Sequence, residues 1–373
     1  MVFTKKIKKK EATSTIKRKY IRKKPLKKDL EKERDTSFTL SKPISNPLIS
    51  PKWENKWESW QTFNPAAILL EDKIHFLYRA IGDDGVSRFG YAMSEDGFLI
   101  KKRLPFPVYQ HQTKAGPYFC NNYPSGGSWS GCEDPRLVRV EKEDKIYITY
   151  TACDGGLGVG LSSIKIKDFI NNNWNWKTPK IISKPGEVHK NWLIFPKKFN
   201  NKYAIIHSIS PEILIEYLDD LEFKNKKYIE SFYSPAKVEK ERWDSKVRGV
   251  GPPPIETKDG WLLLYHAEDR RDPGKYKIGA LILDKNDPRK ILYRSKQPIL
   301  EPKEYYELEG YKPGVVYALG AVIKNNKFIV YYGGADNYVC VAFTEINNFL
   351  ENLKKGEKSK FDVLTLKKKT NKK

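Results

Sequence analysis

The sequence predicts an all-β fold, a five-bladed β-propeller flanked by basic tails. Aromatic residues make up 13% of the 373 residues, with 9 Trp and 22 Tyr, and 24 Gly and 23 Pro recur at short intervals. Stretches with helical periodicity are scarce. One order of strand-like segments returns five times, about every 55 to 70 residues, which suits blades of four strands around an axis.

Each of the first three recurrences joins a hairpin to a third strand. In the first, Glu71-Asp72 forms the turn between two apolar runs, and the third strand ends at the acidic turn Glu95-Asp96-Gly97-Phe98. The expected strands are 67–70, 73–79 and 87–94, then 137–140, 146–152 and 158–165, then 193–199, 203–208 and 212–217.

The fourth and fifth recurrences follow the same order. Lys258-Asp259-Gly260 and Asn325-Asn326 supply their hairpin turns. The expected strands are 251–256, 261–267 and 277–283, then 317–323, 327–332 and 337–344. A pair of β-sandwiches is the alternative architecture, but five repeats of one internal rhythm fit it poorly.

Positive charge is concentrated at the two ends of the chain, whose formal net charge is +23. Residues 1–36 are rich in Lys and Arg with few large apolar residues, and 364–373 is basic as well. Such segments bury too little apolar surface to offset their ordering entropy. We therefore expect disordered tails at 1–36 and 351–373 around a five-bladed propeller domain at 37–350. The first tail could contact a polyanion such as RNA or anionic lipid, or be a solvated extension without a partner.

The cysteine pattern indicates a reducing compartment. Cys120, Cys132, Cys153 and Cys340 form no CxxC pair, and the histidines complete no zinc spacing. Cys120 and Cys132 could bridge a loop, but so few cysteines in a chain of this length are more often free thiols. No apolar stretch follows the cationic N-terminus, and no run is long enough for membrane insertion. We expect a cytoplasmic protein.

The segment most informative for chemistry is Glu133-Asp134-Pro135-Arg136, which lies between a Gly/Ser/Trp-rich loop and an alternating strand. An Asp before a Pro often only shapes a turn. A carboxylate at the inner end of a strand in an aromatic-rich all-β protein is, however, a common place for the acid of a sugar-cleaving enzyme. Asp134 is therefore the candidate catalytic acid.

Other polar residues occupy comparable places in the strands that would line a propeller channel. Asn64 precedes Pro65, Lys190 precedes an LIFP run, and three prolines follow Gly251. Since the innermost strands of successive blades converge on one funnel, their ends would build a single site from residues far apart in the sequence.

Seven motifs follow one another along the chain: NPA at 64–66, LYRAIGDDGVSRFGYAMSEDG at 77–97, GCEDPR at 131–136, LIFP at 193–196, GVGPPPI at 249–255, WLLLYHA at 261–267 and YYGGAD at 331–336. Together they resemble the glycoside hydrolase family 130 enzymes, which are mannoside phosphorylases and related β-mannosidases. The resemblance covers about residues 64–343 and leaves both tails outside it. The family fold is a five-bladed β-propeller, in agreement with the periodicity.

The resemblance implies a role for each of four residues. Asp134 matches the catalytic acid, which in the phosphorylases protonates the glycosidic oxygen through the 3-hydroxyl of the mannosyl unit. Inorganic phosphate attacks the anomeric carbon with inversion and gives α-mannose 1-phosphate. Asn64, Arg79 and Asp336 match positions that hold the mannosyl unit. Read from the residues alone, Arg79 could instead pair with an acid at 83–84, and Asp336 could cap a glycine turn.

Phosphorolysis requires cations that hold inorganic phosphate beside the sugar. Family phosphorylases place basic residues before the LFP-type motif, in a His-Arg pair after the next hairpin, and ahead of the GPPP motif. Lys190 matches the first position, and Lys246 and Arg248 are both available for the third. His207 is followed by Ser208, so one expected cation is missing. We expect phosphate at Lys190, His207, Lys246 and Arg248.

Two alternative functions stay open. Hydrolysis with inversion needs a carboxylate base roughly 6.5 to 9.5 Å from the acid, and Glu187, Glu212 and Glu268 are the candidates. A non-catalytic sugar-binding propeller would tolerate the missing cation but would not need the acid at 134. A mannose-containing oligosaccharide is the expected ligand in each case.

Aromatic and histidine side chains supply the other expected sugar contacts. Tyr123 and Trp129 flank the loop ahead of Asp134 and are placed for an acceptor subsite. His266 either faces the channel or is a hydrogen-bonded core histidine. No metal, nucleotide or flavin motif occurs, so we expect no metal and no cofactor, with inorganic phosphate as a co-substrate. Assembly into a homo-oligomer, frequent among these phosphorylases, is compatible with the sequence.

Overall fold

The computed structural model describes residues 38–111, 126–153, 156–231 and 242–356. The chain divides into two units, Met1–Thr36 and Ser37–Lys373, and every described residue belongs to the second. The tail expected at 1–36 lies outside the described residues, and so does most of the tail expected at 351–373.

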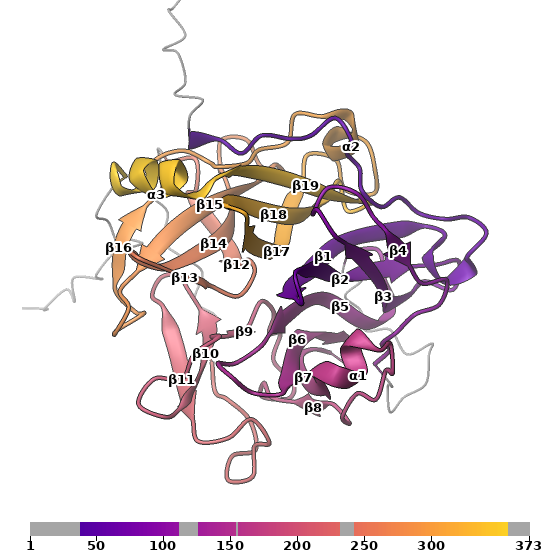
Figure 1. The fold of residues 1–373 in the computed structure, drawn as a ribbon, viewed down its shortest axis with the longest axis horizontal. Coiled ribbons are helices and arrows are strands. Elements are labelled where there is room, and N and C mark those ends of the chain that lie inside the picture. Colours follow the sequence, from indigo (N-terminus) through magenta and orange to yellow (C-terminus); the bar gives the residue numbers. More distant parts are fainter. Residues whose placement is uncertain (1–37, 112–125, 154–155, 232–241, 357–373) are drawn as a thin grey trace, which may run out of the picture. The chain divides into compact units, whose positions relative to one another are not determined.

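The second unit consists mainly of β-strands, which confirms the all-β prediction (Figure 1). Among the described residues, antiparallel pairing joins the strands into five groups that follow one another along the chain. The first two groups are β1 (Gln61–Leu70), β2 (Lys73–Ile81), β3 (Val86–Ser94) and β4 (Lys102–Arg103), then β5 (Ser130–Val138), β6 (Lys145–Cys153), β7 (Leu157–Lys165) and β8 (Lys180–Ile181).

The other three groups correspond to the third, fourth and fifth recurrences in the sequence. The third is short, and the fourth has five strands because two of them, β12 and β13, pair with the same neighbour, β14. These groups are β9 (Leu193–Ile194), β10 (Tyr203–Ser208) and β11 (Leu214–Leu218); β12 (Lys246–Val250), β13 (Ile255–Thr257), β14 (Gly260–Glu268), β15 (Tyr276–Leu283) and β16 (Ile291–Arg294); and β17 (Val316–Lys324), β18 (Lys327–Gly334) and β19 (Tyr338–Glu345).

Helices are few and short in the described part of the chain. They are η2 (Lys56–Glu58), α1 (Ile166–Ile170), α2 (Tyr305–Leu308) and α3 (Ile346–Lys354). The last of them extends beyond residue 350, where the sequence analysis ended the domain. That boundary is too early, because Leu350 and Leu353 lie on one face of α3 and are buried in the hydrophobic core.

Strand residues alternate between two hydrophobic clusters because successive side chains point to opposite faces of a sheet. In β14, Leu262 and Leu264 pack into a cluster shared with the fifth group, whereas Leu263 and Tyr265 pack into one shared with the third. Further clusters join the first group to the second and the second to the third. A fifth cluster joins the last group back to the first.

The first and last groups also meet through their backbones. β1 pairs in parallel with β17, with Ala66 opposite Leu319. A second parallel pair, β3 with β5, joins the first group to the second. The ends of the described domain are therefore held against each other by both hydrogen bonds and apolar packing.

The first strand of four groups carries a β-bulge, an extra residue that re-aims a side chain. The bulges lie between Phe63 and Ala66 in β1, and between Glu133 and Arg136 in β5. Others occur at 247–249 in β12 and 318–320 in β17. The strand expected at 251–256 is interrupted, since three prolines without N–H donors separate β12 from β13.

Gly131 fixes the approach of β5 to β3. Its φ is +99°, and a Cβ at this position would lie 2.1 Å from the carbonyl oxygen of Ser87. Since the obstacle is backbone, we expect Gly131→Ala to lower the free energy of unfolding by about 2 kcal/mol or more. Urea unfolding measures this. Gly158→Ala is the control, because its Cβ would meet only side-chain atoms at 3.1 Å or more; an equal cost in both variants would contradict the expectation.

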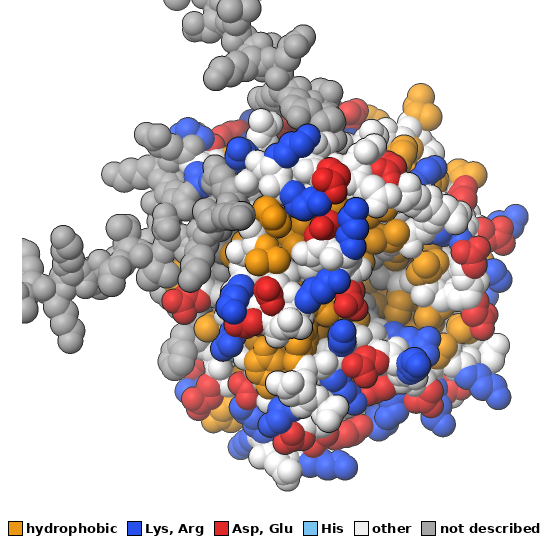
Figure 2. Space-filling view, turned by 60° about the vertical axis from the view of Figure 1, so that its left-hand side comes forward, with side chains coloured by type: hydrophobic (Ala, Val, Ile, Leu, Met, Phe, Trp, Pro, Cys, Tyr) orange, Lys and Arg blue, Asp and Glu red, His pale blue; other side chains and the backbone are white. Residues whose placement is uncertain are grey.

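Figure 2 shows Lys and Arg interspersed with Asp and Glu over the face in view, so positive charge is not gathered into one patch there. Cys132, Cys153 and Cys340 are free and buried; Cys120 lies outside the described residues. In the described ranges no helix has the length and apolar character needed to cross a membrane.

Candidate active site

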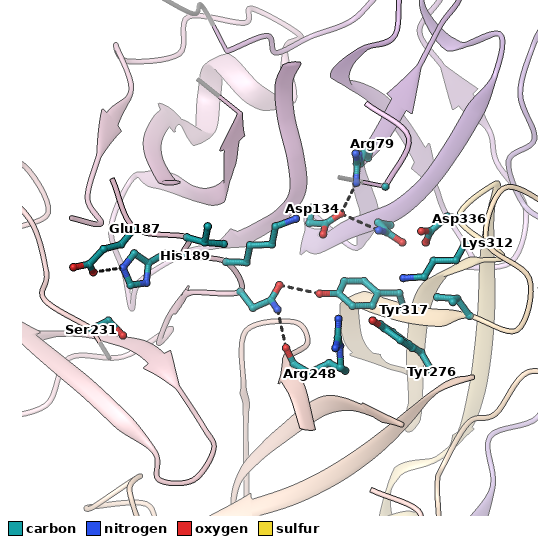
Figure 3. Close-up of a pocket in the computed structure, with 16 residues that line it drawn as sticks. Arg79, Asp134, Glu187, His189, Ser231, Arg248, Tyr276, Lys312, Tyr317 and Asp336 are labelled. Carbon is teal, nitrogen blue, oxygen red and sulfur yellow. Dashed lines mark hydrogen bonds and ion pairs between the residues drawn. The ribbon is translucent and has the colours of Figure 1, made fainter. Parts of the chain in front are cut away.

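A cavity of about 830 Å³ is lined by residues from the first, second, fourth and fifth groups of strands and by the loops on either side of the third group (Figure 3). It is rich in charged side chains of both signs. The lining residues are Asn64, Arg79, Gly126, Asp134, Glu187, Val188, His189, Lys190, Asn191, Ser231, Arg248, Tyr276, Lys312, Val315, Tyr317 and Asp336.

Asp134 reaches this cavity from the bulge of β5. Its φ of 55° places it in the left-handed region, and the residue is 7% exposed. Asn64, from the corresponding bulge of β1, also has a positive φ, 46°, and donates a hydrogen bond of 2.8 Å from Nδ2 to Oδ1 of Asp134. The two X-Pro bulges thus bring together two residues that are 70 positions apart.

Arg79 contacts two carboxylates of the EDPR segment, Glu133 and Asp134. Its Nη1 lies 3.4 Å from Oδ1 of Asp134, and its Nη2 lies 3.2 Å from Oε1 of Glu133. Asp84 instead pairs with Arg88 at 2.6 Å. The guanidinium also lies 4.7 Å from the centre of the Phe63 ring. Asp84 thus has Arg88 as its ion-pair partner, while the ion pairs given for Arg79 are with Glu133 and Asp134.

Glu133 is the centre of a buried charge network behind Asp134. It has no exposed surface, pairs with Arg79, and lies 3.0 Å from Nζ of Lys190. Ser128 Oγ and Cys153 Sγ donate to it at 3.0 and 3.2 Å. Burial alone would raise the pKa of Glu133, but the two cations outweigh burial and lower that pKa to about 2.

Asp336 is a second carboxyl group in the cavity. It lies in the turn between β18 and β19 with a φ of 49°. Burial raises the pKa of its carboxyl group to about 6, although Lys312 and Arg79 oppose this shift. A carboxylate in this position can accept hydrogen bonds from sugar hydroxyls.

The basic residues expected at the phosphate site separate into two sets. Lys190 and Arg248 line the cavity. Lys246 does not; its ammonium pairs with Glu268. His207 is also outside the lining and shares a hydrogen bond of 2.8 Å with Ser231, which does line it.

The β12 bulge resolves which of the two neighbouring cations faces the cavity. Lys246 pairs with Glu268 across the strands, and Val247 packs against the core. Arg248 is the extra residue before Gly249, so its side chain turns to the cavity. Sequence spacing alone could not distinguish Lys246 from Arg248.

His266 lies behind the cavity wall and not in it. Its ring is wholly buried, its Nε2 lies 2.9 Å from the carbonyl oxygen of Ala318, and it stacks on Tyr317 with ring centres 3.8 Å apart. Burial lowers the pKa of this imidazole to about 3, so the ring is neutral at neutral pH. His266 supports Tyr317, which lines the cavity.

Of the two aromatic residues expected at the acceptor subsite, Tyr123 lies outside the described residues, and Trp129 is 54% exposed.

The carboxylates considered as hydrolytic bases are engaged elsewhere or exposed. Glu187 lines the cavity but contacts Lys184 at 3.1 Å and His189 at 2.9 Å. Glu268 pairs with Lys246, and Glu212 is exposed. Within the described ranges, no group of three or more His, Cys, Asp or Glu is arranged to hold a metal ion.

Several lining residues were not identified from the sequence. Lys312, Tyr276, Tyr317 and Asn191 come from turns or strand ends without a distinctive motif. Asn191 directly follows Lys190, and its Oδ1 accepts a hydrogen bond of 2.8 Å from Tyr317. The only sequence signal for this set was the position of Asn191 next to Lys190.

Comparison with known families agrees with the site. A model of glycoside hydrolase family 130, described as beta-1,4-mannooligosaccharide phosphorylase, matches residues 31–355. The chain belongs to glycoside hydrolase family 130. The resemblance inferred from the motifs is thereby confirmed.

Curated members of family 130 are similar over most of their length. The 1,2-beta-oligomannan phosphorylase of Thermoanaerobacter sp. (strain X514) is 36% identical over 304 residues, 77% of this chain and 90% of the relative. A beta-1,2-mannobiose phosphorylase of the same organism is 34% identical over 296 residues, 76% of this chain and 89% of the relative. The crystal structure of a glycosyl hydrolase from Bacteroides ovatus has a TM-score of 0.67 at 25% identity, covering 83% of this chain and 94% of that one.

Proposed function

We propose that this family 130 enzyme cleaves β-mannosides by inverting phosphorolysis, giving α-mannose 1-phosphate and a shortened sugar. The observation that carries the proposal is one cavity in which the buried Asp134 and the cations Lys190 and Arg248 face a common space. An acid and an anion site beside each other are what phosphorolysis requires, because the nucleophile itself is anionic.

Asp134 acts in this reaction as the acid, and Asn64, Arg79 and Asp336 hold the mannosyl unit. Asn64 and Arg79 fix the carboxyl group of Asp134 through the contacts at 2.8 and 3.4 Å. By the family resemblance, the proton passes to the glycosidic oxygen through the 3-hydroxyl of the sugar. A donor held in one orientation keeps that hydroxyl in line for the transfer.

The described carboxylates favour phosphorolysis over hydrolysis. Hydrolysis with inversion needs a carboxylate that can take a proton from water. Of the three candidates, Glu187 and Glu268 are held in ion pairs and Glu212 is exposed. Lys190 and Arg248, by contrast, are cations that line the cavity and can bind phosphate.

We further propose a β-1,2 linkage as the preferred substrate and a five-bladed propeller as the architecture. The two relatives described above are named for β-1,2-linked substrates. The propeller is supported by five antiparallel groups and by five hydrophobic clusters that join each group to the next and the last to the first.

A substrate panel tests both the reaction and the linkage. β-1,2- and β-1,4-linked manno-oligosaccharides are incubated with and without inorganic phosphate, and mannose 1-phosphate and free mannose are quantified. We expect phosphate-dependent mannose 1-phosphate, formed faster from the β-1,2 series. Free mannose at equal rates without phosphate would identify a hydrolase. Sugar binding without turnover would identify a non-catalytic binding protein.

A further inference from the structure

We propose that Lys312 joins Arg248, already expected at the phosphate site, in binding the inorganic phosphate and replaces the arginine that is missing at position 208; both side chains lie over the ring of Tyr276. The inference rests on the phosphorolytic function proposed above. It assigns to the phosphate site a lysine, Lys312, that follows no basic motif in the sequence.

Tyr276 holds the two cations at one wall of the cavity. Nζ of Lys312 lies 4.3 Å and Cζ of Arg248 lies 5.0 Å from the centre of its ring. All three side chains line the cavity (Figure 3). The tyrosine is only 7% exposed, and its backbone N–H donates to the carbonyl of Gly314, so the platform is fixed. A cation over an aromatic face is attracted by the ring quadrupole and keeps its charge available to a ligand.

The charge balance distinguishes these cations from the others in the cavity. Four Lys or Arg side chains line the part of it that the structure describes. Arg79 and Lys190 lie against Glu133, with Asp134 beside Arg79. Their charges are therefore largely balanced by the protein itself.

Arg248 and Lys312 are balanced less completely. Lys312 makes no ion pair within the described ranges, although Asp336 interacts with it electrostatically over a longer distance. Arg248 has a 3.7 Å contact with Glu268, whose same oxygen lies closer to Lys246. One carboxylate thus faces two cations, and positive charge is left over for an anion.

Neither of the residues that stand where family phosphorylases carry the His-Arg pair is charged at neutral pH. Ser208 is neutral, and its hydroxyl donates to the carbonyl of Ser210 at 3.2 Å. Burial lowers the pKa of the neighbouring His207 to about 4, so its imidazole is uncharged at neutral pH. The charge that the missing arginine would have supplied is therefore sought at another wall of the cavity.

The ligand that fits this pair is phosphate and not a sugar hydroxyl group. A guanidinium matches two oxygens of a phosphate, and an ammonium adds a third charged donor. Neutral hydroxyls gain much less from two cations. Arg248 comes from β12 and Lys312 from the segment before β17, so the site depends on the packing of the fourth and fifth groups.

Steady-state kinetics with phosphate and β-1,2-mannobiose varied separately tests the inference. For Lys312→Met and for Arg248→Met we expect the KM for phosphate to rise about 10- to 100-fold. The KM for the sugar should stay within about twofold of wild type. Lys312→Arg keeps the charge and should recover most of the affinity for phosphate.

Lys327→Met is the matched control. This lysine also lies over aromatic rings, at 5.3 Å from Phe98 and 5.5 Å from Phe343, but on β18 outside the cavity. Its replacement should leave the KM for phosphate unchanged. Thermal midpoints equal to wild type exclude misfolding as the cause in the test variants.

Two results would overturn the inference in distinguishable ways. If wild type forms mannose 1-phosphate and both test variants keep its phosphate KM within twofold, the site is wrong and the proposed function stands. If wild type forms none, calorimetric titration with inorganic phosphate decides. Binding that is lost in Lys312→Met and Arg248→Met supports the site, whereas equal binding, or none in wild type, overturns it.

Discussion

Asp134→Asn should lower kcat for phosphorolysis by about 10³- to 10⁴-fold while the protein stays folded. The substitution keeps the shape of the side chain and removes the transferable proton. It also preserves an oxygen that can accept the hydrogen bond from Asn64, which is 2.8 Å long in the wild type. Initial rates of mannose 1-phosphate release, with a thermal denaturation profile of each protein, measure the effect.

The control for this prediction is Asp84→Asn, since Asp84 is an acid outside the cavity that pairs with Arg88. It should retain wild-type kcat within about twofold, as expected for a surface ion pair. More than a tenth of wild-type activity in Asp134→Asn would show that another group supplies the proton. Asp336 would then be examined first.

Glu133→Gln should produce the largest loss of stability among these variants. It leaves Arg79 and Lys190 close together without the carboxylate that lies 3.2 and 3.0 Å from them. Removal of one partner from a buried ion pair costs about 3 to 5 kcal/mol. Activity should fall at least about 100-fold as well. Without Glu133, Arg79 is no longer held against Asp134, and Lys190 is no longer held where it faces the phosphate. Urea unfolding and initial rates measure the two effects.

The pH dependence of stability provides an independent check on Glu133. Its pKa is about 2 in the folded protein and near 4.5 in the unfolded chain. Since the folded-state pKa is the lower one, the carboxylate stabilises the fold above about pH 4.5, and this contribution is lost as pH falls toward 2. The difference in unfolding free energy between wild type and Glu133→Gln should therefore shrink over that interval.

The exposed pair of Glu256 and Lys197, 3.5 Å apart, supplies the control. Glu256→Gln should change the free energy of unfolding by less than about 0.5 kcal/mol. If Glu133→Gln proved as mild as Glu256→Gln, the buried network would not hold the site together.

The parts of the site that could be predicted from the sequence are those marked by backbone constraints. Asn64 and Asp134 each precede a proline in the first strand of a repeat, and a proline in a strand forces a bulge or an edge. Because the pattern recurs in the first strands of successive groups, the two residues could be predicted to lie in one site. The order of the strands could also be predicted from the sequence, because alternating apolar residues bounded by turns specify hairpins locally.

The parts that could not be predicted depend on which side chains meet across groups. Lys312 lies near Tyr276 only because the fourth and fifth groups pack together, and no spacing in the sequence records that contact. The same holds for His266, whose burial behind Tyr317 follows from stacking between β14 and β17. Lys246 and Arg248 differ only by a bulge that breaks the simple alternation.

A ³¹P NMR time course of the protein with β-1,2-mannobiose and inorganic phosphate distinguishes phosphate from water as the nucleophile. Phosphorolysis with inversion predicts that α-mannose 1-phosphate grows as inorganic phosphate declines in equal amount, and that Asp134→Asn gives no such signal. Cleavage of the disaccharide with the phosphate signal unchanged would contradict the account and identify water as the nucleophile.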